Sequence, residues 1–302
     1  MNTTSPHGWF KHAGLLAALV LTGFTTCAAD ELTGVMKKAK AAGTVYVGYR
    51  ASSVPFSFVS GHGDPIGYSI DICRNIVAAM SDEVGRELTI KWVLVTSETR
   101  IPAVVAGDVD LECGSTTNNA ERAKQVGFSP IMFIAGTKMM VKKGSPIQSF
   151  KDLKDKAVVV TAGTTNEKAI RELNEKFKIG LKLVTAKDHA DSFSLVKSGG
   201  ADAFATDDVL LYGLIAKNKA QGDYFVVGDF LSYDPYGITY KKGDVAMKKV
   251  IDTTFANMAE ERELEQAYKK WFLSRLPSGD RINLPMSAQL DSVFRTLATK
   301  SD

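Results

Sequence analysis

The chain lacks the features that would place it outside the ordinary globular class. Three cysteines among 302 residues exclude a dense disulfide scaffold. Neither sign of charge dominates, since the formal net charge is +3, and no basic tract with interleaved aromatic residues indicates a nucleic-acid partner. Beyond the N-terminus no apolar run is long enough to span a bilayer. A composition of 45% hydrophobic and 24% charged residues is typical of a globular protein, and the chain is long enough to form two lobes.

Catalytic and cofactor-binding motifs are missing as well. There is no P-loop, no H-E-x-x-H and no C-x-x-C, and the glycines of residues 61–67 miss the G-x-G-x-x-G spacing by one residue. Ser194 and Lys197 match an S-x-x-K pattern, but its S-D-N and K-T-G companions are not present. We therefore expect no catalytic residue, no metal and no cofactor.

The N-terminus carries a short apolar stretch, residues 13–24, which follows Lys11 and precedes the small residues Cys27, Ala28 and Ala29. This pattern is typical of a secretory signal peptide, so we expect residues 1–29 to be cleaved and the protein to be exported to the periplasm. A membrane anchor is the alternative, but spanning a bilayer takes roughly 20 apolar residues. Cys27 also raises a lipoprotein alternative, although residues 24–26 match a lipobox poorly.

Two cysteines, Cys73 and Cys113, would remain after cleavage. Export makes a disulfide chemically possible, because disulfides persist in oxidising compartments. Two buried free thiols are equally compatible with the sequence, since the sequence does not place the sulfurs relative to each other. Both alternatives stay open at this stage.

Strand-like and helix-like segments alternate along the chain. The expected strands cover residues 45–49, 90–95, 109–111, 157–160, 181–184, 203–205 and 224–227. The expected helices cover residues 68–80, 101–106, 167–177, 192–197, 208–217, 245–258 and 263–272, with a last amphipathic helix after Pro277. Such alternation favours an α/β fold in which sheets are flanked by helices. Ligands on such sheets bind at the carboxyl ends of the strands.

The most informative segment is residues 112–130, ECGSTTNNAERAKQVGFSP. Its hydroxyls, Ser115 and Thr117 among them, follow an expected strand, and we expect a helix to begin there. Backbone amides and hydroxyls at a helix start favour an anion. Arg122 lies five residues after Thr117, and a guanidinium can bind a carboxylate through two parallel hydrogen bonds. The segment therefore predicts a carboxylate site that needs neither a metal nor a nucleophile.

This segment resembles the signature of the periplasmic solute-binding proteins of family 3, which carry polar amino acids to ABC importers, and the similarity extends over nearly the whole chain. The resemblance implies a two-lobed α/β fold of the type II periplasmic-binding-protein kind, with two crossover segments near residues 136–138 and 232–234. Lobe 1 would contain residues 30–137, lobe 2 residues 138–233, and residues 234–302 would return to lobe 1 and end in a helical tail. A monomer that closes on its ligand and docks on a membrane ABC permease is also implied.

Two segments that follow strands in lobe 1 match the family's ligand contacts. The first, residues 50–56, carries Arg50 in the pattern Arg-x-Ser-Ser-Val-Pro-Phe, and the alternative there is a solvated arginine. The second carries Ser97 and Arg100, which in the branch specific for acidic amino acids contact the ligand side chain. The alternative is that Ser97 only caps the next helix and Arg100 lies on the surface. The family's usual amide-bearing segment between these two is replaced here by residues 98–99.

The resemblance further implies that Ser115 and Thr117 contact the ligand and that Arg122 binds its α-carboxylate. Helix capping alone is the alternative for Ser115 and Thr117. In lobe 2, Thr165 would add a hydroxyl and helix-start amides to the same carboxylate, and a plain capping turn is the alternative for that residue.

Two further residues of lobe 2 complete the implied site. His189 stands in the Lys-Asp-His context of the family's acidic-ligand members. Asp207 aligns with the acid that binds the ligand's α-ammonium group, which leaves Asp208 as a helix cap or surface residue. A lone histidine is more often a plain core residue, so the role of His189 rests on the resemblance.

The charges of these residues point to the substrate. Three arginines and one aspartate give a site charge of +2 when His189 is neutral. Arg122 and Asp207 suffice for the α-groups of any amino acid, so Arg50 and Arg100 are left for a second carboxylate, because a desolvated arginine needs an anionic partner. L-glutamate or L-aspartate is therefore the expected ligand.

Three other functions remain open on the sequence. One is a broader carrier that also takes glutamine and asparagine. Another is a periplasmic dehydratase on the same fold, for which His189 and Asp191 would be the acid–base pair. The third is a signalling role in which the liganded protein docks on a membrane sensor.

Overall fold

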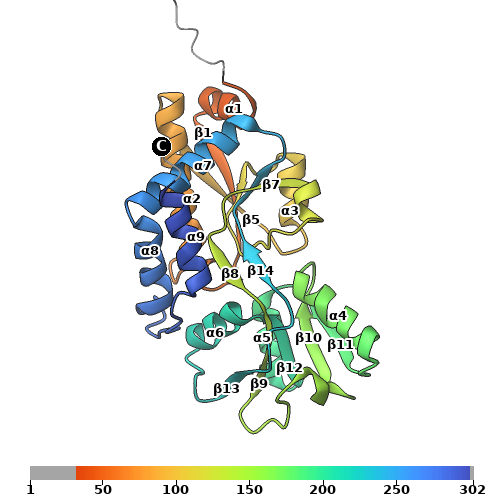
Figure 1. The fold of residues 1–302 in the computed structure, drawn as a ribbon. Helices are drawn as coiled ribbons and strands as arrows, with labels where there is room; N and C mark the ends of the chain where they lie inside the picture. The colour runs from red at the N-terminus through yellow and green to blue at the C-terminus, as the bar shows by residue number, and fades with distance from the viewer. Residues whose placement is uncertain (1–31, 300–302) are drawn as a thin grey trace, which may run out of the picture. The chain divides into compact units, whose positions relative to one another are not determined.

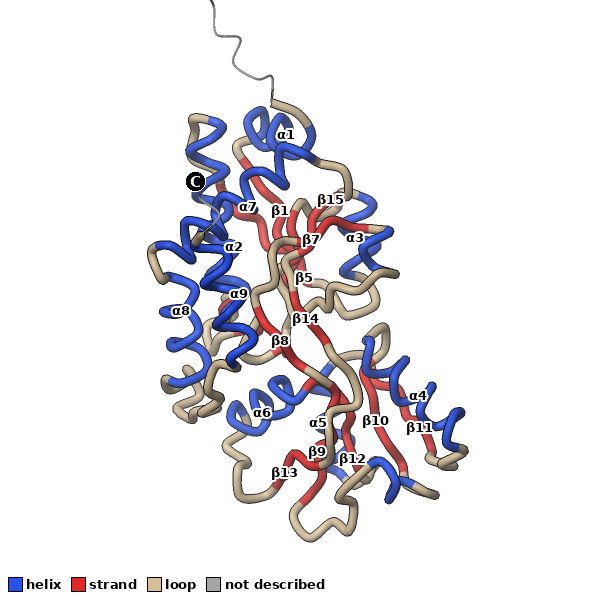
Figure 2. The backbone as a smooth tube through the Cα atoms, viewed as in Figure 1, coloured by secondary structure: helices blue, strands red, loops and turns tan. Residues whose placement is uncertain are grey.

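The computed structural model describes residues 32–299, so the predicted signal peptide, its cleavage site and Cys27 lie outside the described residues. The fold is α/β and two-lobed, and each lobe is built around a five-stranded sheet with helices against it (Figures 1 and 2). None of the helices between residues 32 and 299 is long and apolar enough to cross a membrane.

The sheet of lobe 1 has the strand order β5-β1-β6-β15-β7. Its strands are β1 (Thr44–Tyr49), β5 (Thr89–Leu94), β6 (Leu111–Glu112), β7 (Val126–Phe128) and β15 (Thr239–Lys241). β1 is parallel to β5 and β6, whereas β15 is antiparallel to β6 and β7. A small three-stranded sheet follows β1 and consists of β2 (Ser52–Ser53), β3 (Ser57–Val59) and β4 (Pro65–Ile66). β15 joins lobe 1 although the chain has meanwhile passed through lobe 2.

The helices of lobe 1 come from both ends of the described chain. They are α1 (Gly34–Ala42), α2 (Tyr68–Val84), α3 (Arg100–Ala106), α7 (Val245–Glu260), α8 (Glu263–Tyr268) and α9 (Ala288–Ala298). The apolar residues predicted for the core of α2, Ile70, Ile72, Ile76 and Val77, are buried in one cluster with Val45 and Val47 of β1. The burial of each such side chain stabilises the folded state by about 1.5–3 kcal/mol.

The sheet of lobe 2 has the order β11-β10-β12-β9-β13. Its strands are β9 (Thr137–Lys142), β10 (Ala157–Thr161), β11 (Lys182–Ala186), β12 (Ala203–Asp207) and β13 (Tyr224–Val227), and its helices are α4 (Thr165–Phe177), α5 (His189–Ser198) and α6 (Asp208–Lys217). Val158 and Val160 of β10 pack in one apolar cluster and Val159 in another. Successive side chains of a strand point to opposite faces, so this split means that both faces of β10 are covered.

Two short strands join the lobes. β8 (Phe133–Ala135) leads into β9 of lobe 2, and β14 (Asp234–Tyr236) leads back to β15 of lobe 1. The two strands pair antiparallel, with Ala135 opposite Asp234. Beside them the Ser232 hydroxyl accepts a hydrogen bond from the Thr137 amide at 2.9 Å. These segments lie where the resemblance placed the two crossovers, while the lobe boundaries themselves stay a prediction.

Cys73 and Cys113 form a disulfide, with their Cα atoms 6.3 Å apart, so neither is a free thiol. The bridge joins α2 to the residue that follows β6. Cross-linking residues 40 positions apart stabilises a fold by about 2–4 kcal/mol, because it restricts the unfolded chain. It also ties the start of the segment that contains Ser115 and Thr117 to a buried helix.

The helix expected to start at residues 115–117 is absent, so that prediction was wrong. β6 is followed by irregular chain, and the first helical turn after it is a short 3-10 turn, Arg122–Lys124. The reason is a tertiary contact. Thr117 forms an antiparallel bridge to Tyr236, and the amide of Asn118 donates to the carbonyl of Pro235 at 2.7 Å, so this backbone pairs with the second crossover segment.

Two helix boundaries near the C-terminus also differ from expectation. The helix predicted over 263–272 is α8 as far as Tyr268 and then a wider π turn, Lys269–Leu273. The last amphipathic helix, α9, begins only at Ala288, where the Ser287 hydroxyl caps it by accepting a hydrogen bond from the amide of Leu290 at 3.2 Å. The apolar face of α9 is buried on lobe 1 through Leu290, Phe294 and Leu297.

Candidate functional site

The predicted site residues gather at the carboxyl ends of parallel strands, where α/β proteins hold their ligands. Eight of the nine are buried, and Thr165 is partly exposed. One small cavity is lined by six of them, which are Arg100, Ser115, Thr117, Thr165, His189 and Asp207. A second pocket, of about 380 Å³, lies beside it and is lined by Ser97 and Arg122 together with Thr165. Arg50 lines neither pocket, but it lies 3.5 Å from Asp188, the residue that precedes His189.

Lobe 1 contributes three buried arginines. Arg100 donates to the carbonyl oxygen of Ser115 at 3.1 Å, and Arg122 donates to that of Thr117 at 3.2 Å. Arg122 also reaches into lobe 2, where it donates to the carbonyl of Gly163 at 3.2 Å. Arg50 is fully buried, and its guanidinium has no hydrogen-bond partner among residues 32–299. Arg50 is therefore not the solvated arginine that was its alternative.

Burial weakens the basicity of these arginines. Burial, followed by repulsion from Arg100, lowers the pKa of Arg50 to about 10 and that of Arg122 to about 10. Burial likewise lowers the pKa of Arg100, and the carboxylate of Glu112 opposes this effect most strongly. All three side chains stay cationic at neutral pH.

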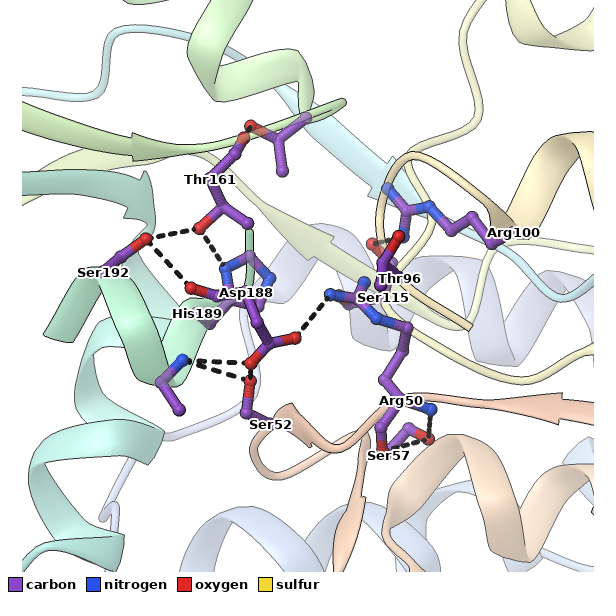
Figure 3. Close-up of polar contacts among 12 residues, drawn as sticks. Arg50, Ser52, Ser57, Thr96, Arg100, Ser115, Thr161, Asp188, His189 and Ser192 are labelled. Carbon is purple, nitrogen blue, oxygen red and sulfur yellow. Dashed lines mark hydrogen bonds and ion pairs between the residues drawn. The ribbon is translucent and has the colours of Figure 1, made fainter. Parts of the chain in front are cut away.

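The charge count of +2 was wrong, because it omitted two acids that the fold brings to the arginines. Asp188, which precedes His189, places a carboxylate oxygen 3.5 Å from a terminal nitrogen of Arg50 (Figure 3). Glu112, at the end of β6, is fully buried, and the pKa of Arg50, Arg100 and Arg122 is raised by its charge. With Glu112, Asp188 and Asp207 all ionised and His189 neutral, the formal charge of the site is zero.

These two acids carry little signal in the sequence. Glu112 looks like an ordinary strand residue, and Asp188 looks like a helix cap, which it also is, since it accepts from the amide of Ala190 at 3.1 Å. The one available hint is that a charged residue stands directly after an apolar strand and before Cys113 and Gly114. A charged side chain is almost never fully buried unless it has a partner.

Ser97 does not cap α3, so the capping alternative for this residue was wrong. Thr99 is the capping residue, and the hydroxyls of Thr96 and Thr99 bond each other's backbone amides at 2.9 and 3.2 Å. The hydroxyl of Ser97 is buried and has no hydrogen-bond partner in the described part of the chain. A buried polar group of this kind is costly unless it finds a partner, which makes Ser97 a candidate ligand contact.

In lobe 2, His189 is the first residue of α5 and is buried. Its Nδ1 lies 2.8 Å from the hydroxyl of Thr161, which lies 2.9 Å from that of Ser192 (Figure 3). Burial, and then the charges of Arg50 and Arg100, lower the pKa of His189 well below 6.5, so the ring is neutral. Asp191 is exposed on the same helix, so the structure does not bring this proposed acid–base pair into the cavity.

Asp207 ends β12 and is buried opposite the arginines. Its carboxylate accepts hydrogen bonds from the amide of Asn166 at 2.8 Å and from the phenol of Tyr236. Burial and the nearby charge of Asp234 raise the pKa of Asp207 to about 7. Asp208, predicted as a helix cap or surface residue, is neither, because it is half-buried at the first position of α6 and Asp207 holds the cap position.

The hydroxyl of Thr165 does not cap helix α4. Thr164 caps α4 by accepting from the amide of Glu167 at 3.1 Å. Thr165 instead lies 3.3 Å from the hydroxyl of Thr117, so the two side chains meet across the lobes. A further contact between the lobes joins the hydroxyl of Ser52 to the carboxylate of Asp188 (Figure 3). Within residues 32–299 no group of three acidic, histidine or cysteine side chains could hold a metal ion.

Comparison with known proteins identifies relatives along almost the whole chain. Residues 45–274 match the model of the bacterial extracellular solute-binding proteins, family 3. The L-glutamate/L-aspartate-binding protein of Pseudomonas aeruginosa is 44% identical over 292 residues, which are 96% of this chain and 94% of the relative. A glutamate/aspartate import solute-binding protein of Escherichia coli is 40% identical over 94% of this chain and 96% of its own length.

The fold has close counterparts among solved structures. One is an ancestral amino acid-binding protein described as a precursor of cyclohexadienyl dehydratase. It superposes with a TM-score of 0.68 at 31% identity and covers 79% of this chain and 99% of its own. The structural likeness therefore includes both lobes.

Proposed function

Because the chain belongs to the bacterial extracellular solute-binding proteins of family 3, we propose that it captures L-glutamate or L-aspartate and delivers it to an ABC importer. The relatives named for these two amino acids, at 44% and 40% identity, support this substrate. The observation that carries the proposal is that three arginines are buried at the site: Arg100 lines the cavity that also contains the buried Asp207, Arg122 lines the adjoining pocket, and Arg50 has no hydrogen-bond partner in the described chain.

Each charged group then has a separate role. Arg122 binds the α-carboxylate, with the hydroxyls of Thr117 and Thr165 beside it. Asp207 binds the α-ammonium group. The zwitterionic part of any amino acid would be held in this way, because these groups are common to all of them.

The remaining groups bind the distal carboxylate of the ligand. Arg50 and Arg100 supply the positive charge, with Ser97 and Ser115 as neighbouring hydroxyls. His189 is neutral and can offer a hydrogen bond without changing the charge of the site. The guanidinium of Arg50 supports this role, since it has no hydrogen bond in the described chain and its ion pair with Asp188 is 3.5 Å long, which leaves its donors free for a ligand carboxylate.

Binding requires the lobes to move. The cavity between them is only about 10 Å³, too small for any amino acid, so the ligand must enter while they are apart. β8 and β14 form the hinge, with lobe 1 comprising residues 30–137 and 234–302 and lobe 2 comprising residues 138–233. The protein works as a periplasmic monomer after removal of residues 1–29, and closure marks it for the permease.

Calorimetric titration of the mature protein with the common amino acids tests this function. We expect L-glutamate or L-aspartate to bind near micromolar affinity, about −8 kcal/mol. Arg50→Ala and Arg100→Ala should weaken both acids but penalise glutamine and asparagine much less. Tight binding of a neutral or basic amino acid, with neither acid bound, would contradict the proposal. Mass spectrometry of the titrated samples should find the ligand unchanged.

A further inference from the structure

Glu112 is the acid that the three arginines of lobe 1 have in common. The loop that follows Glu112 holds two of these arginines, because the carbonyl of Ser115 accepts from Arg100 at 3.1 Å and that of Thr117 accepts from Arg122 at 3.2 Å. In keeping with this, the charge of Glu112 raises the pKa of all three arginines. Its side chain is 0% exposed. A nearby anion offsets part of the repulsion between buried cations, which solvent screens only weakly.

The carboxylate of Glu112 is held at one oxygen only. Oε2 accepts from the hydroxyl of Thr116 at 2.6 Å and from that of Thr239 at 3.5 Å. Oε1 is buried and has no hydrogen-bond partner among residues 32–299. A carboxylate that served only to stabilise the fold would be expected to have both oxygens satisfied, because an unpaired buried acceptor is costly.

Gly114 makes room for this arrangement. A Cβ atom there would lie 2.3 Å from Oε1 of Glu112 and 3.0 Å from Cγ of Arg50. Any larger residue would push the carboxylate or the arginine out of place. The absence of a side chain at position 114 therefore keeps Glu112 and Arg50 packed around the same point.

We propose that Glu112 is the resident counter-ion of Arg50, Arg100 and Arg122 and that it sets how strongly the site prefers acidic over neutral amino acids. The proposal rests on the function given above and concerns a residue that positions and tunes the arginines without touching the ligand. Before binding, Glu112 lowers the cost of three buried cations. After binding, it repels the incoming carboxylates, so an acidic ligand is bound less tightly than three arginines alone would allow.

Glu112→Gln tests this role, because it removes the charge and keeps the shape. We expect L-glutamate or L-aspartate to bind about tenfold tighter, L-glutamine to change by less than about threefold, and the unliganded protein to melt at a lower temperature. Asp110→Asn is the matched control. Asp110 is a buried acid on the same chain segment whose partner is Lys38 at 2.9 Å, so its loss should leave the acid-to-amide ratio unchanged.

An unchanged acid-to-amide ratio in Glu112→Gln, with stability lost, would make Glu112 a structural residue and overturn the proposal. Should Glu112→Gln fail to fold, Thr116→Val decides the question. This variant removes the 2.6 Å hydrogen bond that holds Oε2 in place, so the carboxylate can move away from the arginines and the acid-to-amide ratio should rise about two- to threefold. No change in that ratio would equally overturn the proposal.

A ligand-free measurement separates this proposal from the proposed function. Denaturant unfolding of Glu112→Gln, Arg100→Gln and the double variant forms a double-mutant cycle. We expect the double variant to lose less stability than the two single variants lose together. The difference should correspond to about tenfold in the unfolding equilibrium constant. This coupling would be measurable even if the wild-type protein bound neither L-glutamate nor L-aspartate. Additive losses of stability would refute the role of Glu112 as a counter-ion.

Discussion

The two walls of the site differ in how they are charged. The lobe 1 wall holds three arginines with Glu112 near them, and despite burial the pKa of Arg50 and that of Arg122 remain at about 10. The lobe 2 wall holds a neutral histidine and an aspartate whose pKa is about 7. Lobe 1 is therefore fixed in charge across the physiological range, while lobe 2 can change its charge with pH.

This difference suggests a division of labour in the proposed mechanism. Lobe 1 supplies the attraction for carboxylates, so removing one of its arginines should weaken the binding of every anionic ligand. Lobe 2 supplies the group for the ammonium and the contacts that form on closure, such as those of Asp188 with Arg50 and Ser52. Three experiments test the comparison, ordered from the largest expected effect to the smallest.

Arg122→Ala should cause the largest loss. Truncating one member of a buried charge pair typically costs about 2–5 kcal/mol of binding free energy, partly because the ligand carboxylate is left without a partner. Because Arg122 is assigned to the α-carboxylate, glutamate and glutamine should weaken alike. Calorimetry at fixed salt measures both. A loss confined to the acidic ligands would place Arg122 on the distal carboxylate and reverse the assignment.

Affinity should also depend on pH through lobe 2. The ammonium group prefers ionised Asp207, whose pKa is about 7 because of burial and the charge of Asp234. As pH falls below 7, affinity should drop by up to about tenfold per unit, since Asp207 must release a proton to bind. Asp208, Tyr236, Arg100 and Arg122 also act on this carboxylate, and Arg122, with a pKa of about 10, keeps its charge over that range.

The stability of the unliganded protein should move in the opposite direction. Asp207 has a raised pKa, so between pH 4 and 7 the native state holds this proton and the unfolded state does not. Its contribution is then favourable at low pH and is lost as pH rises towards 7. Asp207→Asn should flatten both profiles. An affinity that does not vary between pH 5 and 8 in the wild-type protein would remove Asp207 from the ammonium site.

Asp188→Asn should have the smallest effect. The Asp188 side chain is 21% exposed and 3.5 Å from Arg50, so solvent reaches one partner of a long ion pair, and we expect it to contribute about 1 kcal/mol. The variant keeps the cap of α5 and should weaken acidic and amide ligands by less than about fivefold. Titration with both ligands measures the change. A loss as large as that of Arg122→Ala would mean that closure, and not the charge of lobe 1, dominates affinity.

Much of the fold was predictable from local pattern. Strand and helix alternation, the apolar face of α2 and the buried valines of β10 follow from periodicity, which the backbone geometry imposes on any chain. The helix expected to begin at residues 115–117 was wrong, whereas residues 269–272 are helical but form a π turn. The backbone beyond Thr117 bonds to the second crossover segment, more than a hundred residues away in the chain, and no local pattern reports such a contact.

The sequence by itself determined which chemical groups are available: three arginines, two hydroxyl-rich turns and an aspartate, all in segments at or beyond the ends of strands. Only the tertiary structure decided their net charge, because Glu112 and Asp188 look like ordinary strand and capping residues until folding brings them to the arginines. It also decided that Cys73 and Cys113 are joined. The physical reason is that electrostatic energy depends on distance and burial, which the order of residues along the chain does not specify.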